Sequence, residues 1–217
     1  MTGWIELLLA ALAMTNLALL GSSRLRLGIR IVAVQGVALG LLPLVADERL
    51  AGVRVALLAV GTIVLKGIVF PRLLSRARRQ ANVRREKEPL IGFTASMLAG
   101  AAAFGFSLWL ASRLPLPETG RSELIVPVAL FTILCGLLLI VTRRIALNHV
   151  LGYLTFENGV YAFGIALALR EPLVVELGVL LDVFVAVFVM GIAIFHISRE
   201  FDSIDTDELQ SLRDWDR

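Results

Sequence analysis

The apolar residues of this chain fall into long runs that are separated by short breaks rich in arginine, proline and glycine. A hydrocarbon core about 30 Å thick is crossed by about 20 helical residues, and several of the runs reach that length. Helices satisfy their own backbone hydrogen bonds, as a segment inside lipid requires. We therefore predict seven transmembrane helices, over residues 3–21, 27–46, 51–71, 89–112, 124–142, 149–169 and 172–197.

This pattern predicts an all-α polytopic membrane protein, and its two halves are weakly similar at a period of about 124 residues. The segment "VLKGIVFPRL" (64–73) matches "FVMGIAIFHI" (188–197), which aligns Gly67 with Gly191. We expect two three-helix repeats joined by a central helix. The predicted units are a first membrane unit (1–71), a basic cytoplasmic loop with the linking helix and an outer loop (72–123), a second membrane unit (124–197) and an acidic tail (198–217).

Composition agrees with a membrane protein, and the positions of the charges predict its orientation. Hydrophobic residues make up 58% of the chain and charged residues 18%, against about 25% in soluble domains. Fifteen arginines and lysines fall in the connections on one side of the predicted helices and five on the other. Excess positive charge marks cytoplasmic loops, so we expect a cell-membrane protein with its N-terminus outside and its C-terminus in the cytoplasm. No soluble domain remains to present the arginines to nucleic acid, so we expect no nucleic-acid partner.

The residues that usually hold redox centres are scarce. The single cysteine, Cys135, lies within a predicted helix, and the two histidines, His149 and His196, are far apart in the chain. Iron–sulfur clusters and structural zinc sites need several cysteines or histidines at suitable spacing. We therefore expect no cofactor, no metal and no catalytic site in this chain.

Three ionisable residues lie deep within predicted helices: Lys66, Glu157 and Asp182. Charges at such depth are costly, and they are usually paired or face a wet interior. Glu157 and Asp182 fall near the same depth on consecutive antiparallel helices, so the two carboxylates could share a cavity. For Lys66 two interpretations stay open. The amine either extends to the membrane surface or is a buried group that exchanges protons with carboxylates.

Glu157 also lies on a polar stripe of its own helix. His149, Tyr153, Glu157 and Tyr161 recur at a spacing of four residues, which places them on one helix face. With water between its members, such a stripe could conduct protons. The alternative is that the tyrosines serve packing and that His149 marks the membrane interface.

The second predicted helix carries features of helix packing. Gln35 lies midway along it and cannot titrate, so we expect it to hold helices together by hydrogen bonding. Gly36 and Gly40 follow with the spacing G-x-x-x-G, which allows two membrane helices to approach closely.

The sequence "GYLTFENGVYAFGIAL" (152–167), followed by "PLVVELGVLLDVFVAVFVMGIAIF" (172–195), resembles the hydrogenase-4 membrane component E family of group 4 [NiFe]-hydrogenases. Its C-terminal half is similar to the K-type subunit of respiratory complex I and to the C-type subunit of Mrp cation/proton antiporters. The lysine and proline at Lys66 and Pro71 also have counterparts in the family. The resemblance implies a subunit of a multi-subunit oxidoreductase that couples redox chemistry to proton translocation.

The resemblance also implies partners and roles. The partners would be antiporter-like and other membrane-arm subunits in the bilayer, with peripheral redox subunits on the cytoplasmic side. By position, Glu157 matches the first of two membrane glutamates in the K-type subunit. Asp182 would stand for the second, with a shorter reach.

Three functions are compatible with these observations. The first is a non-catalytic subunit whose relay residues Glu157, Asp182 and Lys66 contribute to proton conduction or redox–ion coupling. The second is a structural spacer that joins antiporter-like subunits and has no titrating groups of its own. A stand-alone transporter is third, because the chain is small and shows no inverted repeat with broken helices.

Overall fold

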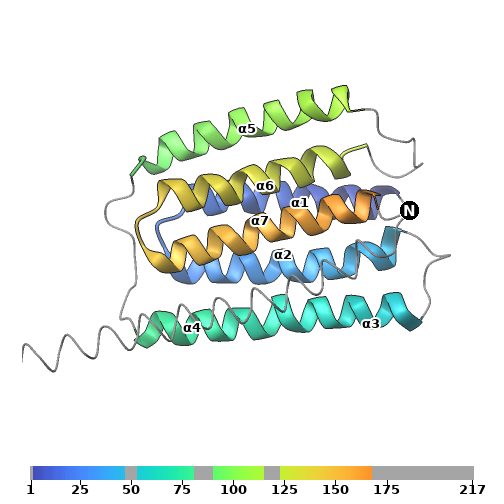
Figure 1. Cartoon of the computed structure of the whole chain (residues 1–217), viewed down its shortest axis with the longest axis horizontal. Helices are drawn as coiled ribbons and strands as arrows, with labels where there is room; N and C mark the ends of the chain where they lie inside the picture. Colours follow the sequence, from blue (N-terminus) through green and yellow to red (C-terminus); the bar gives the residue numbers. More distant parts are fainter. Residues whose placement is uncertain (1, 47–52, 81–89, 115–122, 168–217) are drawn as a thin grey trace, which may run out of the picture.

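The computed structural model describes residues 2–46, 53–80, 90–114 and 123–167, and within these ranges the chain is helical, without strands (Figure 1). The all-α prediction is therefore confirmed for this part of the chain. The seventh predicted helix, 172–197, lies outside it, and so do Asp182 and the segment 188–197 that matches 64–73. The elements are α1 (Thr2–Gly21), α2 (Leu25–Ala46), α3 (Val53–Thr62), the π-helix η2 (Ile63–Val69), α4 (Phe70–Gln80), α5 (Phe93–Arg113), α6 (Ile125–Thr142) and α7 (Ala146–Leu167).

Four of these helices contain segments long and apolar enough to cross a membrane, which indicates a membrane location. The segments are Gly3–Gly21, Leu25–Leu44, Phe93–Arg113 and Ile125–Thr142. Each matches a predicted helix to within a few residues.

The third predicted helix differs from its expected form. Residues 51–71 were expected to be one helix followed by a loop, but α3, η2 and α4 follow one another without interruption to Gln80. The helix continues because α4 is amphipathic: Phe70 and Leu74 are buried against the bundle, while Arg72 and Arg76 are exposed. Part of the predicted basic loop is therefore helix.

The helices lie side by side as a bundle (Figure 1). Helix α5 forms one edge and packs on α1 and α6, while α3, η2 and α4 form the opposite edge and pack on α2. Helix α7 lies between α6 and α2, and contacts both. This arrangement puts α7 in the interior of the described bundle.

The closest helix contact joins α6 to α7, and glycines allow it. A side chain at Gly136 would collide with the backbone nitrogen of Phe156, and one at Gly152 would lie 2.9 Å from the backbone oxygen of Gly136. Small residues at a helix interface permit this backbone approach in membranes.

The apolar core consists of two clusters separated by a polar layer. One cluster gathers around the α1–α2 and α6–α7 turns and includes Leu20, Leu25 and Leu151. The other lies toward the far ends of the same helices and includes Leu9, Leu42 and Ile165. Between them, the buried polar residues of the layer are Asn16, Gln35, Thr62, Lys66, Thr132, Glu157 and Asn158.

We predict that Gly136→Ala lowers the melting temperature of the purified protein, because its new methyl group must push α7 away from α6. The control is Gly105→Ala in α5, where an added Cβ meets no atom within 4 Å. Alanine favours helix over glycine by about 1 kcal/mol, so the control should hold or raise the melting temperature. Thermal unfolding in detergent measures both, and equal melting temperatures would contradict the close packing.

Candidate functional site

The polar layer contains a buried ion pair between η2 and α7. Lys66 Nζ lies 3.5 Å from Glu157 Oε1. Both residues are only 2% exposed. A buried charge is costly when it stands alone and becomes tolerable when paired and hydrogen bonded. The pair therefore ties the two helices together, and each partner depends on the other.

Helix α7 supplies two more contacts to the same amine. Lys66 Nζ donates a hydrogen bond to Asn158 Oδ1 at 3.2 Å. It also lies 5.3 Å from the centre of the Tyr161 ring, within the range of a cation–π interaction. A carboxylate, an amide oxygen and an aromatic face thus surround the amine.

From Asn158 a chain of hydrogen bonds crosses the bundle. Asn158 Nδ2 donates to Gln35 Oε1 at 3.4 Å. Gln35 Nε2 donates to Asn16 Oδ1 at 2.8 Å and to Thr15 Oγ1 at 3.1 Å. Asn16 Nδ2 donates to Thr132 Oγ1 at 2.8 Å. Helices α7, α2, α1 and α6 are therefore joined through side chains within one layer.

All the hydrogen bonds of this network have a fixed donor-to-acceptor direction, which is set at Thr132. The Thr132 hydroxyl donates its only proton to the Val128 carbonyl at 2.7 Å, so it can only accept from Asn16. The amide of Asn16 must then turn its oxygen to Gln35, and Gln35 must turn its oxygen to Asn158. The Asn158 oxygen consequently faces Lys66. A threonine on α6 thus orients an acceptor toward a lysine on η2.

Some buried polar atoms of the layer make no hydrogen bond within the described residues. These atoms are both carboxylate oxygens of Glu157, the Thr62 hydroxyl and the Tyr161 hydroxyl. Thr62 precedes Lys66 by one turn, and Tyr161 follows Glu157 by one turn. The Thr62 and Tyr161 side chains approach each other, so both hydroxyls lie together beside the ion pair. Buried polar atoms of this kind are usually satisfied by ordered water.

The other members of the predicted stripe have different contacts. His149 Nε2 lies 2.7 Å from the backbone oxygen of Arg143, at the start of α7. The Tyr153 ring is half-buried and lies 6.3 Å from the Phe156 ring. The structure thus gathers Tyr161 with the ion pair, whereas these contacts place His149 and Tyr153 nearer the α6–α7 turn.

The predicted packing residues lie against the site. Gln35 belongs to the hydrogen-bond chain itself. A side chain at Gly36 would collide with Lys66, and one at Gly40 would collide with Ile63. Both glycines therefore let η2 approach α2 closely enough for Lys66 to reach α7.

Sequence reasoning missed several residues of this layer. Asn16, next to Thr15, and Thr132 interrupt apolar runs, and Asn158 is adjacent to Glu157. Polar side chains within the apolar runs could therefore have pointed to these residues. Arg143 offered no such indication, because an arginine between two helices is usually exposed. It is buried, donates to the Leu20 carbonyl and lies 4.5 Å from the Phe93 ring centre.

Potential metal ligands are not clustered in the part of the chain that the structure describes. No group of three histidine, cysteine, aspartate or glutamate side chains gathers there. Cys135 is buried with its thiol free.

We predict that Lys66→Met destabilises the protein more than the double substitution Lys66→Met with Glu157→Gln. The single variant leaves a buried carboxylate without its counter-ion, a change that costs about 3–5 kcal/mol in comparable pairs. The double variant removes both charges and should recover most of that loss. Thermal or denaturant unfolding of the purified variants measures the difference, and a double variant as unstable as the single would argue against the pair.

Comparison with known proteins places the chain among relatives. It is 36% identical over 196 residues to the uncharacterized protein Rv0085 of Mycobacterium tuberculosis, covering 88% of this chain and 87% of that protein. It is 28% identical over 155 residues to hydrogenase-4 component E of Escherichia coli K12, covering 71% of this chain and 72% of that protein. The same figures hold for hydrogenase-4 component E of Shigella flexneri. No family model and no solved structure matches the chain. The chain therefore belongs to the family of Rv0085 and is a distant homologue of hydrogenase-4 component E.

Proposed function

We propose that this chain is a non-catalytic membrane subunit of a hydrogenase-like complex, in which the Lys66–Glu157 pair contributes to proton conduction or redox–ion coupling. The homology to hydrogenase-4 component E supports membership of such a complex. The observation that carries the proton chemistry is the buried contact of 3.5 Å between Nζ and Oε1. The electron-transfer centres would belong to partner subunits.

The pair suits proton exchange because a proton donor and a proton acceptor lie within 3.5 Å of each other inside the bundle. Moving one proton from Lys66 Nζ to Glu157 Oε1 converts an ammonium and a carboxylate into a neutral amine and a neutral acid. The charged form gains attraction and the neutral form avoids the cost of burying charge, so the two effects oppose each other. A charge that arrives or leaves nearby can then shift the balance between them.

The amide chain orients the pair, and it does not carry the proton. Amide groups neither release nor take up protons readily near neutral pH, so Asn158, Gln35 and Asn16 hold the acceptor oxygen in front of Lys66. Protons would instead travel through the Glu157 carboxylate and the buried hydroxyls of Tyr161 and Thr62. Hydroxyl groups both donate and accept, and with water molecules they can pass a proton onward.

The relay would continue beyond this centre at both ends. His149 and Tyr153 lie on the same helix face as Glu157 and would extend it to the cytoplasmic end of α7. Asp182, from the following segment, would be the second carboxylate. This direction assumes the orientation predicted from the positive charges, with the N-terminus outside and the C-terminus in the cytoplasm.

The outer faces of the bundle suit contacts with lipid and with other membrane subunits. Large apolar side chains are exposed on α1, including Trp4 and Met14, and on α5, including Leu98 and Trp109. We propose that these faces contact antiporter-like and other membrane-arm subunits, and that peripheral redox subunits bind on the cytoplasmic side. The alternative function is that of a structural spacer, which joins such subunits without transferring protons. The amide network supports this alternative, because it links four helices through fixed hydrogen bonds.

Purification in mild detergent should recover this chain together with larger membrane subunits and a redox arm. Mass spectrometry of the purified material identifies the co-purifying chains. Recovery only as a monomer or a homo-oligomer would contradict membership of a complex.

We predict that Glu157→Gln, compared with the unmodified protein at equal amounts of assembled complex, lowers proton translocation roughly tenfold or more, because the amide keeps the shape and loses the exchangeable proton. Proton uptake by vesicles that contain the complex, measured per electron transferred, tests this.

The matched control is Glu6→Gln, which makes the same chemical change at an exposed position of α1. Its proton translocation should equal that of the unmodified protein. Unchanged translocation in the Glu157 variant would instead assign the chain the role of a structural spacer.

A further inference from the structure

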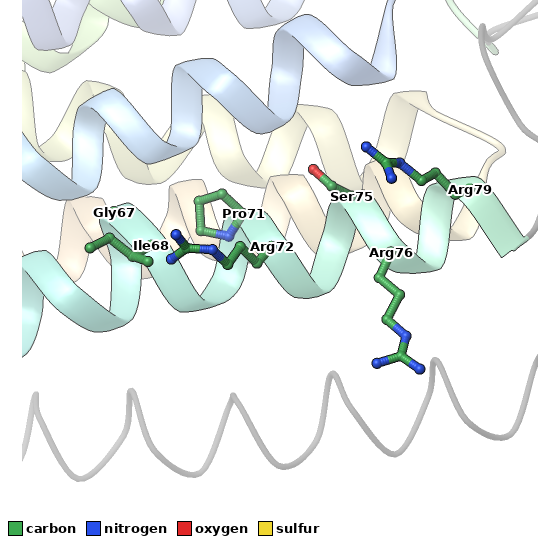
Figure 2. Close-up of a pocket in the computed structure, with 7 residues that line it drawn as sticks. All are labelled: Gly67, Ile68, Pro71, Arg72, Ser75, Arg76 and Arg79. Atoms are coloured by element: carbon green, nitrogen blue, oxygen red, sulfur yellow. The ribbon is translucent and has the colours of Figure 1, made fainter.

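A groove of about 590 Å³ runs along the outer face of η2 and α4 (Figure 2). Its residues lie on adjacent rows with a spacing of four, so they form one continuous helix face. The opposite face of the same helix is fixed, because Phe70 and Leu74 are buried against the bundle. The exposed residues of the groove therefore face away from the buried side of the helix, while Gly67 at its apolar end lies close to α2. Its lining residues are Gly67, Ile68, Pro71, Arg72, Ser75, Arg76 and Arg79.

The groove has an apolar end and a basic end. Gly67, Ile68 and Pro71 form the apolar end, and the arginines follow toward the end of α4 (Figure 2). Figure 2 shows the Arg72 side chain beside Pro71, and the Arg79 side chain on the same side of the helix as Ser75. Guanidinium groups bind phosphate through paired N–H donors, and a serine hydroxyl can donate to the same oxygens.

The groove lies where the helix leaves the hydrocarbon region. Elements α3, η2 and α4 contain 10, 7 and 11 residues in succession. At 1.5 Å per residue this gives roughly 40 Å, which exceeds a hydrocarbon core of about 30 Å. The apolar residues of α3 and η2 occupy the core, so the arginines of α4 reach the level of lipid headgroups.

We propose that this groove binds an anionic phospholipid. The phosphate contacts Arg72 and Ser75, and Arg76, whose side chain points to the other side of α4 (Figure 2), adds positive charge at the same level. The upper part of an acyl chain lies against Ile68 and Pro71. A free phosphate ion would use only the basic end. An acidic protein segment would leave the apolar end at hydrocarbon depth uncovered. The order of apolar and basic residues along one face therefore matches a lipid best.

The test is a thermal-shift measurement on the full chain in a neutral detergent. Phosphatidylglycerol, phosphatidylcholine or inorganic phosphate is added to separate samples. We expect phosphatidylglycerol to raise the melting temperature of the unmodified protein, and the other two to leave it unchanged. An equal shift with phosphatidylcholine, or the full shift with phosphate alone, would overturn the assignment to an anionic lipid.

Matched variants distinguish lipid binding in the groove from nonspecific attraction of the lipid to surface arginines. Arg72→Gln with Arg76→Gln should abolish the shift with phosphatidylglycerol. Arg26→Gln with Arg30→Gln removes two exposed arginines of α2 that do not line the groove, and should retain it. Equal loss in both double variants would mean that any arginine at the membrane surface suffices, and would overturn a specific site.

A third variant tests the groove even if the arginine variant fails to fold. Ile68→Trp fills the apolar end of the groove and leaves every arginine in place. Ile68 is 41% exposed, so the larger ring needs no space within the core. The shift with phosphatidylglycerol should be lost, and co-purified phosphatidylglycerol, counted by native mass spectrometry, should fall in parallel. A retained shift and a retained lipid would contradict acyl-chain binding in the groove.

Discussion

The contact between Lys66 and Glu157 holds the described bundle together at the level where its two apolar clusters separate. Neither residue could be buried alone, because an isolated charge in an apolar interior is far more costly than a paired one. The side chain of Lys66 therefore links η2 to α7. The positions of both helices relative to α2 follow, since α2 lies in contact with each of them.

Both helices that carry the Lys66–Glu157 pair have a backbone feature that allows close packing around it. Lys66 lies in a π-helical segment, an uncommon form that is frequent at functional sites. The absence of a side chain at Gly36 lets that segment approach α2. On the other side, Gly136 and Gly152 bring α6 against α7, and α6 also packs on α1, where Thr132 accepts the hydrogen bond from Asn16 that begins the oriented chain of amides. Packing and polar chemistry are thus parts of one arrangement.

The continuous helix that carries Lys66 contacts the polar layer on one face and carries the groove residues on another. Its inner face places the amine in the polar layer, and its outer face turns basic within two turns, where the proposed lipid groove begins. A lipid bound there would lie against the segment that holds the proposed proton-exchange pair. Contacts at the membrane surface could in this way affect how firmly η2 is held against α7.

The amino-acid sequence by itself determined the four long apolar helices and the identity of the buried charges Lys66 and Glu157. Long apolar runs leave no other backbone solution in lipid, and ionisable residues such as Lys66 and Glu157 stand out within them. The tertiary structure decided which residues meet. Lys66 and Asn158 are 92 positions apart, and Asn158 and Gln35 are 123 apart. No local pattern encodes such pairings, because they depend on how helix faces turn toward one another. The same holds for Arg143, whose burial depends on the Leu20 carbonyl and the Phe93 ring brought to it by other helices.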